Sequence, residues 1–251
     1  MTGTMEREAT STEPATLKSI IEQLGDFDTA LLANTIGYID PTPAHEFYMS
    51  GCIQSLTPAL GPTVGVAVTC EVDSSSPTGD ADWKPYYAQL ERMERMNEPI
   101  VWVVKAAGSR PDHECVMGDG MGKLLSSVGC VGVVTDGRLR DVEGLLTIPF
   151  AAYGRGRTIH HTNVRFTKVD EPMEIGGIIV HPGDVVHANI GGVIVIPPDC
   201  LQALPERAAA MRAFEHQAHC VFRQSGLSVA DKRARVTDLL AEFGFSKPLA
   251  V

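Results

Sequence analysis

Three short runs rich in β-branched residues constrain the fold of this chain more than any other feature. Residues 64–72, 100–105 and 130–134 are almost wholly apolar, which is typical of strands buried on both faces. Amphipathic segments at 83–96 and 118–128 separate them, with apolar residues at helical spacing. Strands that alternate with helices in this way predict an α/β layered fold with a mixed sheet.

The remaining segments suggest how the chain is organised around this core. Helices are expected at 15–24, after Asp26 or Asp28 (either of which can cap a helix), at 139–146, from Pro197 to about 222 and at 229–243. Loops are expected at 37–58 and 74–82, and further short strands at 149–152, 165–169, 173–180, 184–188 and 192–196. We therefore predict a disordered tail at 1–14, a main domain at 15–225 and a C-terminal helical extension at 226–251.

Charge and cysteine usage narrow the classes of function. The 251 residues carry a formal net charge of -10, so the chain has no electrostatic reason to bind nucleic acid or an anionic membrane. No apolar run approaches the roughly 20 residues that span a bilayer. The six cysteines are scattered without a Cys-x-x-Cys pair, and residues 1–13 lack the apolar core of a signal peptide. We expect reduced thiols and a cytoplasmic location.

The segment 116–141 carries the clearest local signal for ligand binding. Gly118-Asp119-Gly120 opens the predicted helix at 118–128, and the first amides of a helix have no intrahelical partner, so they can hold a carboxylate or phosphate. Arg140 and Asp141 follow the strand at 130–134, at the carboxyl edge of the sheet where ligands of α/β proteins commonly bind.

Arg140 and Asp141 offer complementary chemistry. An arginine can grip a carboxylate through two parallel hydrogen bonds, and an aspartate can hold Mg²⁺ or Mn²⁺ together with several waters. Taken separately, these motifs are more often structural, because Gly-Asp-Gly is common in turns and Arg-Asp pairs are common on helix surfaces.

Together, the motifs resemble the RraA-like family, which includes 4-hydroxy-4-methyl-2-oxoglutarate (HMG) and 4-carboxy-4-hydroxy-2-oxoadipate aldolases. That family carries Gly-Glu, a spacer of eighteen to twenty residues and then Arg-Asp; here Gly118-Asp119 precedes Arg140-Asp141 by twenty residues. The pattern G-x-x-G-x-V-x-D-G-x-x-R-D is matched by Gly129, Gly132, Val134, Asp136, Gly137, Arg140 and Asp141. The stretches 176–186 and 191–197 are also similar, and the resemblance spans roughly residues 28–215.

The resemblance implies a fold, an activity and an assembly. The fold would be the layered swivelling β/β/α, phosphohistidine-domain-like architecture of the family. The activity would be that of a divalent-metal-dependent class II pyruvate aldolase/decarboxylase-like lyase. It would cleave a carbon–carbon bond of a small-molecule 2-oxo acid through a pyruvate enolate, by retro-aldol cleavage of a 4-hydroxy-2-oxo acid, by oxaloacetate decarboxylation, or by both. The assembly would be a homotrimer or homohexamer.

The same resemblance implies roles for individual residues. Asp141 would bind the metal, Mg²⁺ or Mn²⁺. Arg140 would bind the 2-oxo acid and stabilise the enolate, and the backbone amides of Gly118, Asp119, Gly120 and Met121 would hold the substrate carboxylate. Asp119 stands at the family's glutamate position and would help orient metal-bound water. Substrate binding is thus expected at Gly118, Asp119, Gly120, Met121 and Arg140, and catalysis at Arg140 and Asp119.

Several positions depart from the family or leave alternatives open. Asp119 is one methylene shorter than glutamate, and Asn189 and Gly191 stand where acidic residues are usual. His160 and His161 suit a solvated loop beside a subunit contact, contact with a second carboxylate, or a proton donor. His113 and Glu114 precede the glycine-rich turn as candidate extra ligands. His187 lies in an expected strand and is expected to pack in the core or to stand at an edge position. Cys115 and Cys130 are expected to be buried thiols.

Two other functions compete with the lyase. Some members of the family bind and inhibit an RNA-degrading enzyme, so the chain would be a non-catalytic regulator with a protein partner. The departures at Asp119, Asn189 and Gly191 also allow an enzyme of the same fold with different carbonyl chemistry. Retention of the Arg140-Asp141 pair favours the lyase, because a pure binding protein has no need of it.

Overall fold

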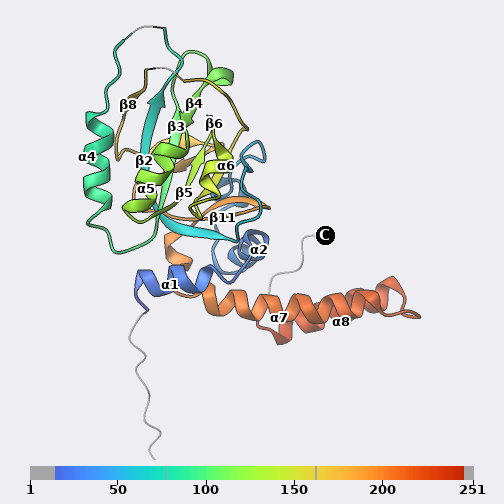
Figure 1. Ribbon diagram of the computed structural model, residues 1–251. Coiled ribbons are helices and arrows are strands. Elements are labelled where there is room, and N and C mark those ends of the chain that lie inside the picture. The colour runs from blue at the N-terminus through green and yellow to red at the C-terminus, as the bar shows by residue number, and fades with distance from the viewer. Residues whose placement is uncertain (1–14, 78, 162, 246–251) are drawn as a thin grey trace, which may run out of the picture.

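A mixed β-sheet is the centre of the computed structural model, which describes residues 15–77, 79–161 and 163–245. Within these residues eight strands join the sheet, seven of them in the order β1-β7-β5-β3-β2-β11-β12, with β8 also paired to β2 (Figure 1). The strands are β1 (Gln54–Ser55), β2 (Thr63–Asp73), β3 (Ile100–Ala106), β5 (Cys130–Thr135), β7 (Ala151–Gly154), β8 (Arg165–Thr167), β11 (Val185–Asn189) and β12 (Gly192–Ile196).

Strand direction follows from the connections. β2, β3, β5 and β7 run parallel, because each connection carries a helix that crosses back over the sheet. β1, β8, β11 and β12 pair antiparallel to their neighbours. The three β-branched runs thus form the middle of the sheet, and the predicted mixed α/β sheet is confirmed.

Three helices cover one face of this sheet: α4 (Lys84–Met93), α5 (Asp119–Ser127) and α6 (Val142–Leu145). The buried cluster between them and the strands includes Trp102, which is fully buried and donates its indole N–H to Gln89 Oε1 at 2.9 Å. The indole N–H of Trp102, a polar group inside this apolar layer, is therefore hydrogen-bonded.

A second β-layer covers the opposite face. β9 (Met173–Ile175) and β10 (Ile178–Val180) form a hairpin, and its apolar residues share a buried cluster with Val101 and Val103 of β3. The alternation of side chains along β3 explains this, since Trp102 points to the helices and its two neighbours point to the hairpin. The predicted β/β/α layering is confirmed.

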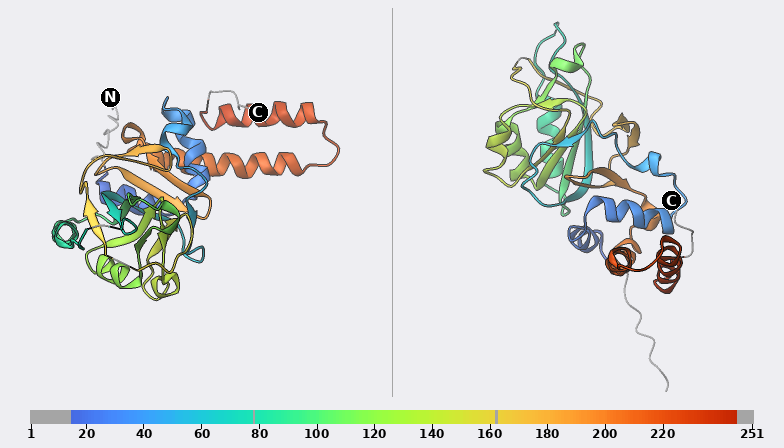
Figure 2. Two further views of the ribbon diagram at one scale, coloured as in Figure 1. Left: turned by 90° about the horizontal axis from the view of Figure 1, so that it is seen from above. Right: turned by 90° about the vertical axis from the view of Figure 1, so that its right-hand side faces the viewer.

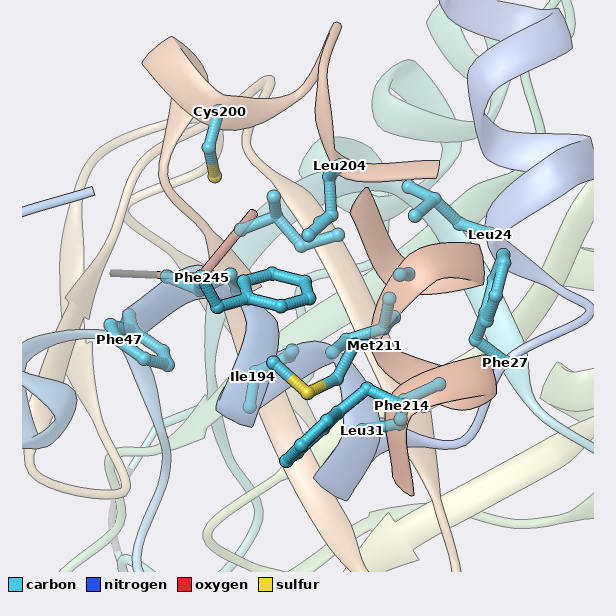
Figure 3. Close-up of a cluster of buried hydrophobic side chains, with 14 of the residues drawn as sticks. Leu24, Phe27, Leu31, Phe47, Ile194, Cys200, Leu204, Met211, Phe214 and Phe245 are labelled. Carbon is cyan, nitrogen blue, oxygen red and sulfur yellow. The ribbon is translucent and has the colours of Figure 1, made fainter. Parts of the chain in front are cut away.

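A helical layer packs against the β11–β12 end of the sheet. It consists of α1 (Leu17–Leu24), α2 (Thr29–Ile39), the short α3 (Ala44–Phe47), α7 (Leu204–Arg223) and α8 (Val229–Glu242). Figure 3 shows Phe27, Met211, Phe214 and Phe245 meeting in its buried cluster. α7 and α8 project together beyond the sheet as an antiparallel pair (Figure 2). None of the helices in the described residues is long and apolar enough to cross a membrane.

The structure resolves one ambiguity and changes several expected elements. Asp28, rather than Asp26, caps α2 by accepting the Leu31 N–H at 2.9 Å. The region 37–58, expected to be loop, contains the end of α2, α3 and β1. The expected strand at 173–180 is a hairpin, because Gly176 and Gly177 both have positive φ and make a tight turn. The predicted tail at 1–14 lies outside the described residues, and the predicted domain boundaries stay predictions.

Candidate functional site

A two-strand parallel ladder brings the two halves of the sequence motif together. β4 (Cys115–Met117) pairs with β6 (Arg138–Leu139), in a register that places Met117 opposite Leu139. The next residues along the two strands are Gly118 and Arg140, and the Arg140 N–H donates to the Met117 carbonyl at 3.1 Å. Leu139 had been expected to begin a helix over 139–146. The pairing of residues 138–139 as a strand is what sets Arg140 beside Gly118.

Gly118 lies directly against the Arg140-Asp141 pair. A methyl group at Gly118 would stand 2.9 Å from Arg140 Nε and 3.1 Å from Asp141 Oδ2. Gly118 has φ -118° and ψ -174°, an extended conformation open to any residue. The glycine is therefore required for space, not for backbone freedom.

The turn after β5 is locked by its own side chains. Asp136 Oδ1 accepts the Ala106 N–H at 2.7 Å, and the Thr135 hydroxyl accepts the Gly137 N–H at 2.9 Å. Burial raises the pKa of Asp136 above its ordinary value. A methyl group on Gly137 would come within 2.5 Å of Val116, so this turn fixes how closely β6 approaches β4.

Asp119 starts α5, and its carboxylate is paired with Lys123 of the same helix. The Lys123 ammonium donates to Asp119 Oδ2 at 2.6 Å, and the same carboxylate packs against Gly144 of α6. The hydrogen bond from Lys123 holds the pKa of Asp119 below its usual range, so Asp119 is ionised at neutral pH. Gly118 at the N-cap position has no side chain to cap this helix, and the Asp119 carboxylate accepts from the Gly120 backbone N–H, so the Met121 amide is the one that remains for a ligand among these first amides.

Asp141 occupies an unusual backbone position at the start of α6. Its φ of 53° and ψ of 37° are left-handed, a conformation that costs energy for most residues and is best tolerated by Asp and Asn after glycine. Its side chain is half exposed and makes no cap hydrogen bond. Its Oδ2 lies 3.5 Å from Arg140 Nε.

Arg140 forms a wall shared by two hollows. The first, which we call the Trp83 cavity, has a volume of about 210 Å³ and is lined by Ser74, Trp83, Cys115, Val116, Met117, Gly118, Gly120, Met121, Arg140, His160, His161 and Val164. The second, which we call the Asp141 hollow, is lined by Arg140, Asp141, Val142, Glu143, Arg157, Thr158 and Ile159. The structure thus gathers Gly118, Gly120, Met121 and Arg140 around one cavity, with Asp141 across the arginine and Asp119 lining neither hollow.

Buried polar contacts hold the rim of the Trp83 cavity. Glu114 is fully buried and accepts the Ser74 N–H and the Ser75 hydroxyl. The Ser74 carbonyl accepts the Nε2–H of His160 at 2.8 Å. Glu114, which had been considered as an extra ligand, is therefore committed to the loop after β2.

The donor set suits a divalent ion only in a limited way. Among the described residues, no three His, Cys, Asp or Glu side chains lie close enough together to hold a metal ion. Asp141 offers one partly exposed carboxylate beside the site. Mg²⁺ commonly takes one or two carboxylates and completes its shell with waters and substrate oxygens. The residues present fit such an ion and do not form a cage for one.

The two cysteines near the site behave as structural thiols. Burial raises the pKa of Cys115 to about 11 and that of Cys130 to about 12, so neither is a thiolate at neutral pH. His187 is fully buried between Thr29 and the Leu24 carbonyl, as expected for a core residue.

Sequence reasoning missed Trp83 and Val164 as cavity residues. Trp83 was placed at the start of the helix expected at 83–96, and Val164 precedes β8, whose pairing with β2 the sequence did not specify. The position of Trp83 directly after the polar loop expected at 74–82 was the signal that the sequence offered. Asn189 and Gly191 lie at the β11–β12 turn, where Asn189 Oδ1 accepts the Gly191 N–H at 2.7 Å, and neither lines the two hollows.

Comparison with known proteins finds relatives with similar sequences. The chain is 28% identical over 121 residues to the protein DlpA of Legionella pneumophila. It is 29% identical over 111 residues to a protein of Halalkalibacterium halodurans provisionally named as a 4-hydroxy-4-methyl-2-oxoglutarate aldolase. These matches cover 43% and 44% of this chain but only 20% and 52% of the relatives, so the chain aligns with about a fifth of one and half of the other.

A solved structure supports the fold. The Streptomyces coelicolor protein RraAS2, described as an unusual member of the RNase ES inhibitor RraA family, superposes with a TM-score of 0.65 and 24% identity over 80% of this chain and 96% of its own. The RraA-like family, described as Aldolase/RraA, matches residues 41–195. This match takes in β4, α5, β6 and both hollows, and more than half of the sequence. The chain belongs to the RraA-like family.

Proposed function

We propose that this protein is a metal-dependent lyase that cleaves a carbon–carbon bond of a 2-oxo acid and releases pyruvate through its enolate. The observation that carries the proposal is the meeting of Arg140, Asp141 and the uncapped start of α5 around Gly118. A regulator that works only through its surface does not require a cation, a carboxylate and free amides at one point.

The chain's own groups suit the two ends of such a substrate. The backbone amides at the start of α5, Met121 first among them, would hold the substrate carboxylate. Arg140 would stand where negative charge develops on the 2-oxo oxygen, as a fixed charge that needs no reorganisation. Its side chain is about one-third exposed, so a ligand can reach it from the Trp83 cavity.

A base takes the proton of the 4-hydroxyl group, the C3–C4 bond breaks, and its electron pair passes into the pyruvate enolate. The former C4 leaves as a carbonyl compound, and C3 then accepts a proton to give pyruvate. Decarboxylation of oxaloacetate reaches the same enolate with loss of CO₂, so one site serves both reactions.

Asp141 would hold the divalent metal, Mg²⁺ or Mn²⁺. When bound, the metal would supply a Lewis acid for the enolate charge. Asp119, ionised and paired with Lys123, would accept a hydrogen bond from water at the rim of the site. Its shorter side chain and its turn toward α6 make it a water-orienting group in this proposal.

Pyruvate release provides the test. Oxaloacetate and 4-hydroxy-4-methyl-2-oxoglutarate would be incubated with the protein in Mg²⁺, in Mn²⁺ and in a chelator, and pyruvate would be measured with lactate dehydrogenase. We expect turnover that the chelator abolishes. Absence of turnover on these and related 4-hydroxy-2-oxo acids with either metal would overturn the proposal.

Arg140→Lys sharpens the test. It keeps the positive charge but loses the planar fork that binds a carboxylate through two bonds, and we expect kcat/KM to fall by roughly 100-fold. Arg138→Lys is the matched control, because Arg138 contacts the Arg155 carbonyl and Asp112 and lines neither hollow. Equal activity of the two variants would count against a catalytic role for Arg140.

Assembly and location are part of the same proposal. We propose a homotrimer or homohexamer, since the apolar residues Phe222 and Val229 stand exposed near the turn of the projecting α7–α8 pair. We propose a cytoplasmic location because all six cysteines are free thiols, as a reducing compartment would keep them. Light scattering of the purified protein tests the assembly, and a monomer would contradict it.

A further inference from the structure

We propose that the Trp83 cavity receives the distal part of the substrate and selects a 4-hydroxy-2-oxo acid with an uncharged, apolar distal group, aryl or branched alkyl. Such a substrate would be preferred over one that carries a second carboxylate. The inference rests on the proposed function, because it assumes that Arg140 and the α5 amides hold the 2-oxo acid end. It concerns the walls of the cavity beyond that end.

The charge of the cavity supports one carboxylate. Of the described residues that line it, Arg140 alone carries a permanent positive charge. One guanidinium committed to the 2-oxo acid leaves no fixed cation for a second anion. Two neighbours of the lining are carboxylates: Asp141 stands beside Arg140, and the buried Glu114 accepts the N–H of Ser74, which lines the cavity. A second carboxylate would lose its hydration without gaining a paired charge, which is costly.

The histidines do not replace the missing cation. His160 donates its Nε2–H to the Ser74 carbonyl, so that N–H is already used to hold the rim of the cavity. His161 lies at the exposed edge. We therefore assign the pair to the entrance of the cavity, where they border the distal group.

The apolar wall is preorganised. Trp83 stands just before α4, its ring centroid 5.8 Å from that of Tyr86 and 5.3 Å from that of Phe166. These contacts support the indole from behind, while 36% of the residue stays exposed. Met121 and Val164 line the same cavity. An indole held in this way favours offset or edge contact with another aromatic or apolar group.

The choice of substrates separates this inference from the proposed function. Exchange of the pyruvate methyl hydrogens for deuterium, followed by NMR with Mg²⁺, reports the enolate chemistry with no distal group at all. Release of pyruvate from 4-hydroxy-2-oxo-4-phenylbutanoate and from 4-hydroxy-4-methyl-2-oxoglutarate then compares an aryl distal group with a carboxylate. We expect exchange to occur, and kcat/KM to be at least about tenfold higher for the phenyl substrate.

Variants of Trp83 test the assignment to this wall. Trp83→Ala is expected to lower the phenyl-to-carboxylate ratio of kcat/KM by roughly tenfold, and Trp83→Arg to reverse the preference by supplying the second cation. Tyr87→Ala is the matched control: Tyr87 is an exposed aromatic of α4, four residues after Trp83, in ring contact with Tyr86, and does not line the cavity. The phenyl-to-carboxylate ratio of kcat/KM in Tyr87→Ala should equal that of the wild-type protein.

Three outcomes would overturn the inference. Exchange together with a preference for the dicarboxylate would remove it and leave the proposed function standing. Equal ratios in Trp83→Ala and Tyr87→Ala would show that the distal group binds elsewhere. Absence of exchange would overturn the proposed function and this inference with it. The wild-type ratio decides the question even if a Trp83 variant fails to fold.

Discussion

Asp141 Oδ2 lies 3.5 Å from Arg140 Nε, and Asp141 reaches this position with a left-handed backbone at φ 53°. Two adjacent side chains would point in different directions from a regular strand or helix. Here Arg140 follows the end of β6 and Asp141 precedes α6, so the strained residue turns the chain and keeps both charges on the same side. Strain of this kind at a charged pair is typical of functional sites.

Asp141→Asn and Asp141→Ala should separate charge from backbone strain. Asparagine tolerates the left-handed region nearly as well as aspartate, whereas alanine does not. We expect both variants to lose metal-dependent pyruvate release by roughly 100-fold. Only Asp141→Ala should also lose about 1 kcal/mol of unfolding free energy, measured by urea denaturation. Full activity in Asp141→Asn would contradict the assigned role.

Gly118→Ala should damage the site without strain in the backbone. The added methyl group would stand 2.9 Å from Arg140 Nε, so the guanidinium must move. Misplacement of a catalytic group by about 1 Å commonly costs on the order of 100-fold in rate, and we expect a loss of that size in kcat/KM for pyruvate release. Gly37→Ala, in α2 with nothing within 4 Å of the added methyl, is the control. It should keep activity and gain roughly 0.5 kcal/mol of stability.

The central strands and the motif residues could be predicted from the sequence because their signals are local. A β-branched run such as residues 100–105 is apolar wherever it lies in the sheet, and Asp28 caps a helix through contacts three residues away. The hydrogen-bonded contact of Arg140 with the β4 end was not local. It depends on a ladder between β4 and β6, which are only three and two residues long, too short to give a periodic pattern.

The residues that line the Trp83 cavity could not be predicted from local sequence patterns either. Trp83 and Val164 are 81 positions apart in the chain, and their segments meet because the Asp82 N–H donates to the Val164 carbonyl at 3.0 Å, next to the pairing of β8 with β2. The orientation of Asp119 depends on Gly144, where only a glycine leaves room for its carboxylate. The family pattern identifies the candidate residues, and tertiary packing determines which way each of their side chains faces.

The six cysteines should differ sharply in reactivity. Cys52 and Cys220 are exposed, while Cys70, Cys115, Cys130 and Cys200 are buried, and burial raises the pKa of the Cys200 thiol to about 12. Brief treatment of the native protein with iodoacetamide at pH 8 should label Cys52 and Cys220 and spare the other four, as peptide mass spectrometry would show. Urea should expose all six. Rapid labelling of Cys115 in the native protein would show that its thiol is reached from the Trp83 cavity and is not protected by burial.

Buried His187 should make the fold sensitive to mild acid. It accepts from or donates to the Thr29 hydroxyl through Nδ1 at 3.0 Å and contacts the Leu24 carbonyl through Nε2 at 3.2 Å. A carbonyl can only accept, so Nε2 carries the proton and Nδ1 accepts from the threonine hydroxyl. This pairing satisfies the neutral ring, and burial lowers the pKa of His187 from 6.5 to about 4.

Because the unfolded chain binds the His187 proton more readily, acid favours unfolding. The stabilisation is fully present above pH 6.5 and is lost as the pH falls from there to about 4. At about 1.36 kcal/mol per pH unit, the loss approaches roughly 3 kcal/mol. Urea denaturation of wild type and His187→Asn across this range isolates the effect, since the carboxylates titrate in both. The free energy of unfolding of His187→Asn should be lower at pH 7 and should depend less steeply on pH. His45→Asn is the control, at a histidine whose side chain is 75% exposed, and its free energy of unfolding should follow the wild-type slope. Parallel pH profiles for wild type and His187→Asn would show that His187 is not held neutral in the core.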